Sequence, residues 1–478
     1  MIALLFWLLA LSIPFVSIPT ATTIMLSSIP FGSLAMLPPG AVGGLTILPY
    51  TIFAFIFIGR MLLAPRVRAG MLDLARRPMA LGFYSLFLLY VVMAAFIMPR
   101  LFSGQILIFP VRGLVHDTAP LRFTSSNISQ LGYLLVTSGL LYSFAALAAL
   151  QDMRTALLRG LLVAAGVVAL TGLLDFVLGT LGRGYLLEPF RTASYALLTE
   201  VQVGGEKRTV GLMPEASAYA QMGVPFLAAL YLLQPFVKDE RIKNFYCRPL
   251  ILVLFFLIFT ARSSTGYLGL GMVLALIAAS WFLDVLERKG VSVSTATVIE
   301  VSFITLSVVL IVSLILSNAK LIDSIANTID YFVFQKTSSG SYKERSMWNT
   351  VSFEAMMKTY GLGLGPGSTR TSSWPVALMA AGGFIGAAFF AVFLLTTFLA
   401  GGTSLEQRPL IRRLKLIVAT NLATYSLVAV GVDYGAFAGI VLGTIVGLRY
   451  RRMAPRPTPT LVPVWMASPR LTDGRRGL

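Results

Sequence analysis

The stretch ALGFYSLFLLYVVMAAFIM, residues 80–98, contains no charged side chain. A run of about 18 or more apolar residues is long enough to cross the hydrocarbon core of a bilayer as a helix. Similar runs recur along the chain, which is 56% hydrophobic and 12% charged, whereas ordinary soluble domains are about 25% charged. Because the runs are too long for barrel strands, the sequence predicts an all-α polytopic membrane protein.

The same criterion predicts about 11 to 14 transmembrane helices, which we assign to one membrane domain, residues 1–450. The tail, residues 451–478, is basic and includes the proline-rich segment APRPTPTLVP, which is typical of disorder. The expected helices span approximately residues 2–17, 21–37, 43–63, 80–98, 128–150, 157–179, 214–235, 249–262, 266–285, 296–317, 373–400, 414–430 and 433–449.

Basic residues are concentrated in the tail and in three short connections between predicted helices. These connections are 64–79, 236–248 and 401–413. The positive-inside rule places them and the C-terminus on the cytoplasmic side, which accounts for the net charge of +18 without a nucleic-acid partner. Three long connections then face the other side, where we expect binding and catalysis. They are 99–127, 180–213 and 318–372.

The chain has one cysteine, Cys247, and one histidine, His116. One cysteine excludes an intrachain disulfide. These counts also exclude a histidine-cluster metal site and Cys/His catalysis, and His116 is expected to be exposed in a loop. We therefore expect no metal and no cofactor.

The third long connection contains SGSYKERSMWNT, residues 339–350. Ser341 and Glu344 fit a capping box at the start of a helix over about 342–360. Arg345 would then lie near the helix N-terminus, where anions are favoured, with Trp348 on the same face. This arrangement predicts an anion site with an aromatic wall. The alternative is a lipid-headgroup arginine beside an interfacial tryptophan.

The second long connection ends in KRTVGLMPEASAYA, residues 207–220. Pro214 suits the first position of a helix, and Glu215 then lies in the first turn, where an acid is favoured by the helix dipole. Alternatively, Glu215 could accept a proton from a hydroxyl at the membrane boundary. Arg208 is either a headgroup contact or a phosphate ligand.

Two glycine-rich segments follow. ARSSTGYLGLG, residues 261–271, places Arg262 at the outward end of a short apolar segment, and its small residues favour helix packing or a half-helix lining a site. GLGLGPGS, residues 361–368, either permits a tight turn with close packing or sets Gly363 and Gly365 against a phosphate. Asp175 lies near an outward helix end, where it would pair with an arginine or cap a helix.

Taken in order, these segments resemble the O-antigen polymerase and O-antigen ligase family, which includes exopolysaccharide polymerases. The pattern R-x-x-G-x-x-x-E-x-S occurs at Arg208, Gly211, Glu215 and Ser217. The segments SSTGYLGLG, ERSMW, GLGLGPGS and AGGFIG (381–386) follow it. The resemblance covers about residues 120–400.

The resemblance implies a GT-C-like, metal-independent glycosyltransferase at the periplasmic face of a bacterial inner membrane. Its donor would be an oligosaccharide on undecaprenyl diphosphate, and its candidate partners are a flippase and a chain-length regulator. Arg208 and Arg345 would hold the diphosphate, with Arg262 or Arg370 in support, as positive charge stabilises this leaving group.

For the acceptor sugar, Glu215 is the candidate base and the reaction inverts the anomeric carbon. Trp348 and Tyr342 would stack on sugar.

The chain departs from the family pattern where ligases carry a histidine after the glycine string. Here that position reads TSSW, residues 371–374, which favours a polymerase over a ligase that transfers glycan to lipid A core. An alternative of another class is a transporter or flippase of an anionic lipid or solute. Charge concentrated at helix ends and in loops favours surface chemistry over transport.

Overall fold

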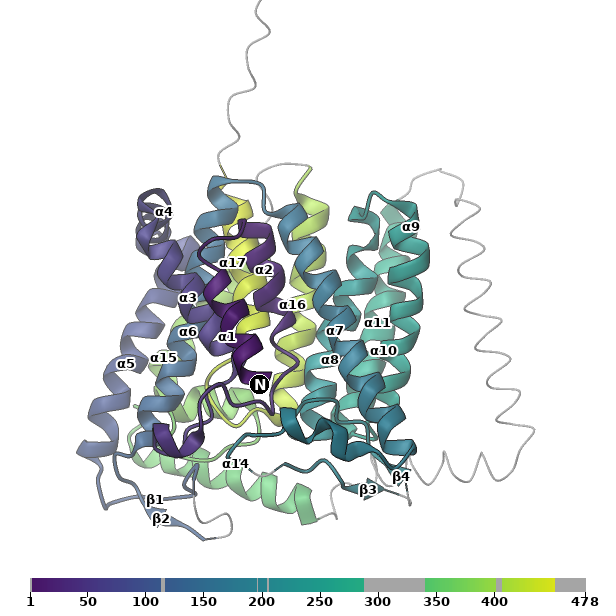
Figure 1. Ribbon diagram of the computed structural model, residues 1–478. Coiled ribbons are helices and arrows are strands. Elements are labelled where there is room, and N and C mark those ends of the chain that lie inside the picture. Colours follow the sequence, from purple (N-terminus) through teal and green to yellow (C-terminus); the bar gives the residue numbers. More distant parts are fainter. Residues whose placement is uncertain are drawn as a thin grey trace, which may run out of the picture.

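The computed structural model describes residues 2–112, 117–195, 197–203, 206–287, 340–400 and 406–451 (Figure 1). These residues are mostly helical, which confirms the all-α class. The predicted helix 296–317, His116 and the tail after Arg451 lie outside the described residues. The α-helices are α1 (Ile2–Ser12), α2 (Ile18–Ser27), α3 (Pro49–Leu63), α4 (Pro65–Arg76), α5 (Phe83–Leu101), α6 (Ser125–Leu150), α7 (Arg154–Thr180), α8 (Ala216–Leu233), α9 (Glu240–Ile242), α10 (Arg248–Thr260), α11 (Ser264–Glu287), α14 (Gly340–Lys358), α15 (Trp374–Leu399), α16 (Arg408–Val428) and α17 (Ala436–Tyr450).

Short elements order the connections. Strand β1 (Leu107–Ile108) pairs antiparallel with β2 (Ala119–Pro120), and β3 (Gln202–Val203) pairs with β4 (Glu206–Lys207). The two hairpins lie in two of the long predicted connections, and they order these loops without forming a larger sheet. The short helical segments are η1 (Pro39–Val42), η2 (Pro78–Gly82), η3 (Gly184–Phe190), η4 (Gln234–Phe236) and η5 (Lys243–Cys247).

By length and composition, six described helical segments can cross a membrane, or seven if the bent pair α3 and α4 is one span. The six are Pro78–Leu101, Ser125–Leu150, Arg154–Thr180, Ala216–Phe236, Glu240–Thr260 and Trp374–Leu399. Four other apolar helices in the described part are shorter. The structure therefore confirms a polytopic membrane protein but not the larger predicted number of crossings.

Prolines explain the main differences from the predicted helices. The predicted helices 2–17 and 21–37 end earlier, at Ser12 and Ser27, shortly before Pro14 and Pro30. A proline disfavours helical geometry in the residue that precedes it. The unpredicted helix α4 begins at Pro65 and is bent by 97° from α3, because proline has no N–H group to continue the preceding helix.

The two ends of the bundle differ. Figure 1 shows α4 and α9 at one end of the helices, and α14 with all four strands at the other. The basic connections 64–79 and 236–248 thus lie at one end, while the described parts of the long connections lie at the other. We refer to the latter as the α14 end.

Helix α17 forms the centre of the bundle, and its residues Ala436–Arg449 are all buried. It packs along α6 through Gly439, Gly443 and Gly447, which share one helix face. A Cβ atom at Gly443 would overlap the Leu141 carbonyl oxygen of α6, so the two helices are in backbone contact.

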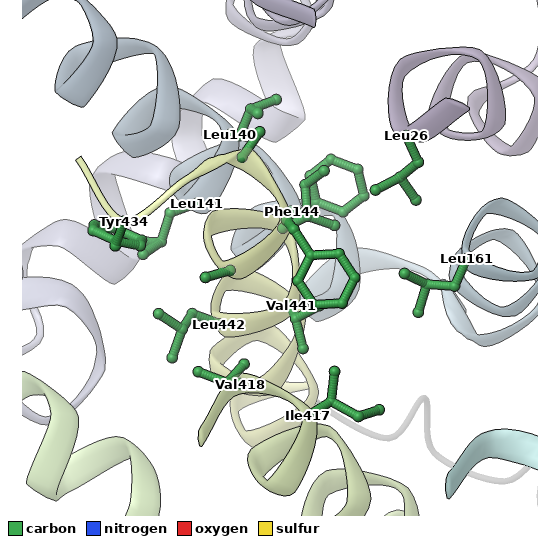
Figure 2. Packing of buried hydrophobic residues seen from close by; sticks show 14 of the residues in the cluster. Leu26, Leu140, Leu141, Phe144, Leu161, Ile417, Val418, Tyr434, Val441 and Leu442 are labelled. Carbon is green, nitrogen blue, oxygen red and sulfur yellow. The ribbon is translucent and has the colours of Figure 1, made fainter. Parts of the chain in front are cut away.

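Figure 2 shows how large side chains surround this contact. Phe144 of α6 and Val441 of α17 lie beside each other, and Ile417 of α16 approaches them from the next helix. Leu26 of α2 and Leu161 of α7 close the cluster on the other side. The core therefore joins five helices from distant parts of the sequence.

We predict that Gly443→Ala destabilises the protein, because the added methyl group meets backbone that cannot move away. Overpacking typically costs about 1–3 kcal/mol. The matched control is Gly271→Ala on α11, where a Cβ atom meets nothing within 4 Å and alanine is the better helix former. The thermal midpoint in detergent should fall for Gly443→Ala and stay or rise for Gly271→Ala. An unchanged midpoint for Gly443→Ala would contradict the α6–α17 contact.

Candidate active site

Helix α14 lies across the ends of the membrane helices (Figure 1). It packs against α15 and β1, and Ser352, Ala355 and Met356 form its buried side. The predicted helix over 342–360 is confirmed, although it ends at Lys358. The predicted capping box is wrong, because Ser341 lies inside the helix and is not its N-cap residue.

The structure brings together two predicted site residues, Arg345 of α14 and Glu215 at the start of α8. Nη2 of Arg345 lies 3.8 Å from Oε1 of Glu215, and the side chains are 33% and 31% exposed. The Ser217 hydroxyl donates a hydrogen bond to the same carboxylate. An ion pair this exposed contributes little to stability. Its significance is chemical, because it sets a cation beside a proton acceptor within reach of a ligand.

The helix start near Glu215 differs from the prediction. Helix α8 begins at Ala216, so Pro214 is not its first residue and Glu215 occupies the N-cap position. The Glu215 side chain makes no capping hydrogen bond. Helix capping therefore does not explain this acid, whose carboxylate is engaged by Ser217 and Arg345 instead.

The segment before Glu215 is held by Asp175, near the end of α7. Oδ2 of Asp175 accepts hydrogen bonds from the N–H groups of Val210 at 2.7 Å and Gly211 at 3.0 Å. Oδ1 lies 3.0 Å from Nη2 of Arg191, and these two side chains are 0% and 1% exposed. The pairing of Asp175 with an arginine, one of the two predicted alternatives, is confirmed.

Gly211 permits the turn that this carboxylate holds. Its φ of 59° lies in the left-handed region, where side chains are disfavoured. A Cβ atom there would lie 2.9 Å from the Tyr219 ring. The chain between Arg208 and Glu215 therefore makes a turn at Gly211, and the Asp175 carboxylate holds that turn by accepting its N–H groups.

Arg208 and Arg262 come together where α10 meets α11. Nε of Arg208 donates to the carbonyl oxygen of Ala261 at 3.1 Å. Arg262 has a φ of 44°, which is uncommon for a residue other than glycine. Both guanidinium groups interact electrostatically with Tyr267. Arg208 and Arg262 therefore lie near the beginning of the segment 208–215, and Arg345 lies beside Glu215 at its end.

Arg370 ties the glycine-rich loop to α14. Its backbone N–H donates to the carbonyl oxygen of Phe109 at 2.7 Å, and its Nη2 donates to the carbonyl oxygen of Val111 at 2.8 Å. Its guanidinium carbon lies 5.0 Å from the centre of the Trp348 ring. Burial lowers the pKa of Arg370, and the nearby Glu344 carboxylate opposes this. Arg370 covers one face of Trp348, so a sugar would have to use the other face.

Tyr342 lies on the exposed side of α14, away from the buried side formed by Ser352, Ala355 and Met356. It borders an open depression of about 470 Å³ on that helix. The lining residues are Tyr342, Lys343, Ser346, Met347, Thr350, Val351 and Glu354. Hydroxyl, ammonium and carboxylate groups beside an aromatic ring are suited to a sugar, and the stacking role of Tyr342 stays a prediction.

The glycine string fills a break in α15. Gly383 has non-helical angles, with φ 58° and ψ −166°. The N–H groups of Leu364 and Gly365 donate to the freed carbonyl oxygens of Ala380 and Ala381, at 2.7 and 3.2 Å. The AGGFIG and GLGLGPGS segments are therefore parts of one packed unit.

Gly363 and Gly365 are buried in this unit. The N–H of Gly363 donates to the Thr359 hydroxyl at 3.0 Å, and a Cβ atom there would lie 2.6 Å from the nitrogen of Gly383. Both glycine N–H groups thus have protein acceptors, and neither is offered to a phosphate. Of the two interpretations of the glycine string, this geometry agrees with a tight turn and close packing, not with a phosphate contact.

Sequence reasoning missed residues that position the site. Arg191 has no signal in the sequence, although its partner Asp175 is recognisable as an acid inside an apolar helix. Asn349 accepts from the N–H of Ser372 at 2.8 Å, and the Ser352 hydroxyl donates to the carbonyl of Arg370 at 2.9 Å. These bonds fix α14 on the loop that fills the α15 break.

Comparison with known proteins assigns the chain to no family. No protein-family model matches the chain, and no curated protein has a significantly similar sequence. The family resemblance therefore rests on the ordered motifs.

We predict that Asp175→Ala is strongly destabilising, because it removes the buried carboxylate that pairs with Arg191 and accepts two backbone N–H groups. Arg191 keeps Glu188 at 3.2 Å, but that carboxylate is 60% exposed and does not reach the segment before Glu215. Such a loss costs about 3–5 kcal/mol. The control is Asp73→Ala, which removes an exposed ion pair with Arg77 whose atoms lie 2.8 Å apart and should cost about 0.2–1 kcal/mol. Thermal midpoints of the two purified variants in detergent provide the comparison. Equal midpoints would show that Asp175 does not hold the segment.

Proposed function

We propose that the protein is a polysaccharide polymerase of the bacterial inner membrane. It would join oligosaccharide repeat units carried on undecaprenyl diphosphate at the periplasmic face, in O-antigen or exopolysaccharide synthesis. A GT-C-like frame and the action of a flippase and a chain-length regulator belong to the same proposal. The observation that supports it most is the partly exposed Arg345–Glu215 pair at the α14 end.

The proposed reaction is a single inverting displacement. The acceptor hydroxyl oxygen attacks the anomeric carbon of the donor while the bond from that carbon to the diphosphate oxygen breaks. The hydroxyl proton passes to Glu215, and undecaprenyl diphosphate leaves with the bond electrons. Preorganised positive charge from Arg345, Arg208 and Arg262 would stabilise the negative charge that develops on the leaving group.

The ion pair gives this mechanism a defined binding step. A donor diphosphate offers Arg345 a more highly charged partner than a single carboxylate, and guanidinium binds phosphate through two parallel hydrogen bonds. Exchange of partners would release Glu215 to accept the acceptor proton. The Ser217 hydroxyl, which already donates to Glu215, would keep the carboxylate oriented.

The segment TSSW supports a polymerase more than a ligase. Thr371 and Trp374 donate to the carbonyl oxygens of Val430 and Val432, at 3.1 and 3.0 Å. These side chains are structural partners of the loop before α17, and no histidine base stands at this place in the sequence.

We predict that Arg345→Ala abolishes long polymer while the protein stays in the membrane. Removing one preorganised donor to a developing charge typically costs about 10²–10³ in rate. The assay complements a clean deletion strain and resolves surface glycans by size. The control is Lys358→Ala, which removes an exposed charge from the last turn of the same helix, outside the depression beside Tyr342, and should leave the polymer unchanged.

The glycan pattern of the deletion separates the alternatives. Single repeats on their final carrier indicate a polymerase. Loss of all attached glycan with lipid-linked polymer accumulating indicates a ligase. Near-normal polymer with Arg345→Ala would exclude the proposed site, and an unchanged pattern in the deletion itself would favour a transporter.

We also predict that Glu215→Gln binds donor but turns over about 10²–10⁴ times more slowly, because the amide cannot accept the proton. Donor binding and single-turnover transfer are measured on the same purified variant. Unchanged turnover would remove Glu215 as the base, and lost binding would assign it a positioning role.

A further inference from the structure

A groove of about 430 Å³ lies between α3 and α6. Its walls are formed by Phe55 and Ile58 of α3 and by Leu135 and Val136 of α6. Phe55 is 70% exposed and Leu135 is 43% exposed, so the groove opens on the outer surface of the helices. In a membrane protein this surface meets lipid chains.

Gly132 gives the groove its depth. A glycine inside a helix is less favourable than alanine, and at other glycines of this chain, such as Gly443, close packing accounts for it. Gly139, further along α6, has Ile58 of α3 2.6 Å from its Cβ position, so the two helices touch there. A Cβ atom at Gly132 meets nothing within 4 Å. The missing side chain leaves space that no part of the described protein fills.

One end of the groove is hydrogen-bonded to the connection 180–213, which precedes Glu215. The Tyr133 hydroxyl, which lines the groove, donates to the carbonyl of Thr46 at 2.9 Å. The Thr46 hydroxyl in turn accepts from the N–H of Ser194 at 2.9 Å. Ser194 belongs to the connection that leads to Gly211 and Glu215. The groove thus begins at the α14 end and runs along the outward halves of α3 and α6.

A cation stands at the same end. Arg112 is exposed and acts electrostatically on Tyr133. The preceding residue, Val111, accepts a hydrogen bond from Arg370, which lies over Trp348. Arg112 is therefore next in the chain to a contact of the candidate site and near enough to Tyr133 of the groove to act on it electrostatically. An apolar channel with a cation at its mouth is complementary to a long hydrocarbon chain that ends in phosphate.

We propose that the α3–α6 groove binds the isoprenoid chain of the lipid-linked donor, with its phosphate-bearing end at Arg112. This inference rests on the proposed function. A methyl-branched isoprenoid chain is wider than a straight acyl chain, and the space at Gly132 accepts the branches. Because the chain leaves lipid and not water, the gain comes from close packing of its branches against the groove walls. Arg112 would then meet the diphosphate from the side of the lipid chain, in addition to the arginines of the proposed reaction.

The test uses a diazirine-bearing undecaprenyl monophosphate, which carries no sugar, with the full-length protein in nanodiscs. Photolabelled peptides are mapped by mass spectrometry. We expect labels on α3 and α6 around Phe55 and Leu135, reduced about tenfold, equivalent to about 1.4 kcal/mol, in Gly132→Phe. The matched control is Gly59→Phe on α3, where a Cβ atom also meets nothing within 4 Å but which does not line the groove.

Competition identifies the occupant. Unlabelled undecaprenyl monophosphate should displace the probe, phosphatidylglycerol at the same mole fraction should not, and Arg112→Gln should weaken the displacement severalfold. Labels elsewhere, labels that survive Gly132→Phe, or equal displacement by phosphatidylglycerol would overturn the proposal.

This test separates the groove from the enzyme activity, because the probe carries no sugar and the readout requires no transfer. A labelled groove in a chain whose deletion leaves the glycans unchanged would keep the lipid site and remove the glycosyltransferase. Transfer activity in a protein whose groove is not labelled would keep the glycosyltransferase and remove the lipid site.

Discussion

The buried carboxylate of Asp175 holds in place the turn that leads to Glu215, on which the candidate site depends. It is buried at the end of α7 and binds both the Arg191 guanidinium and the N–H groups of Val210 and Gly211. A buried charge is costly unless charge and hydrogen bonds compensate it fully. Here that requirement fixes a turn, and the turn sets Glu215 at the start of α8 where Arg345 can reach it.

The other half of the candidate site depends on a similar constraint. The break in α15 at Gly383 frees backbone carbonyl groups within an apolar helix long enough to cross a membrane, and these groups must find partners inside the protein. The glycine-rich loop supplies them, and through Ser352 and Asn349 it carries α14. Two distant segments are thus brought to one place by the need to satisfy buried polar groups, so the Arg345–Glu215 contact follows from how the backbone is held.

Much of the fold was predictable because apolar length is a strong signal, and the helices near 80–98 and 128–150 lie within a few residues of their predicted ends. The sequence also placed a helix at Arg345. It could not show that Gly363 packs on Gly383, since both alternatives use glycine. Nor could it show the Arg345–Glu215 contact or the Arg191 partner of Asp175, because pairing across a long connection leaves no local pattern.

The most direct test of the central claim is transfer by the purified protein alone. The protein is reconstituted in liposomes with one undecaprenyl-diphosphate-linked oligosaccharide as both donor and acceptor, and the lipids are analysed by mass spectrometry. The account predicts lipid-linked products at whole-number multiples of the repeat, with an equivalent of free undecaprenyl diphosphate for each bond formed, and none of either with Arg345→Ala. Intact donor after prolonged incubation with wild-type protein, under conditions where the donor is shown to bind, would contradict it.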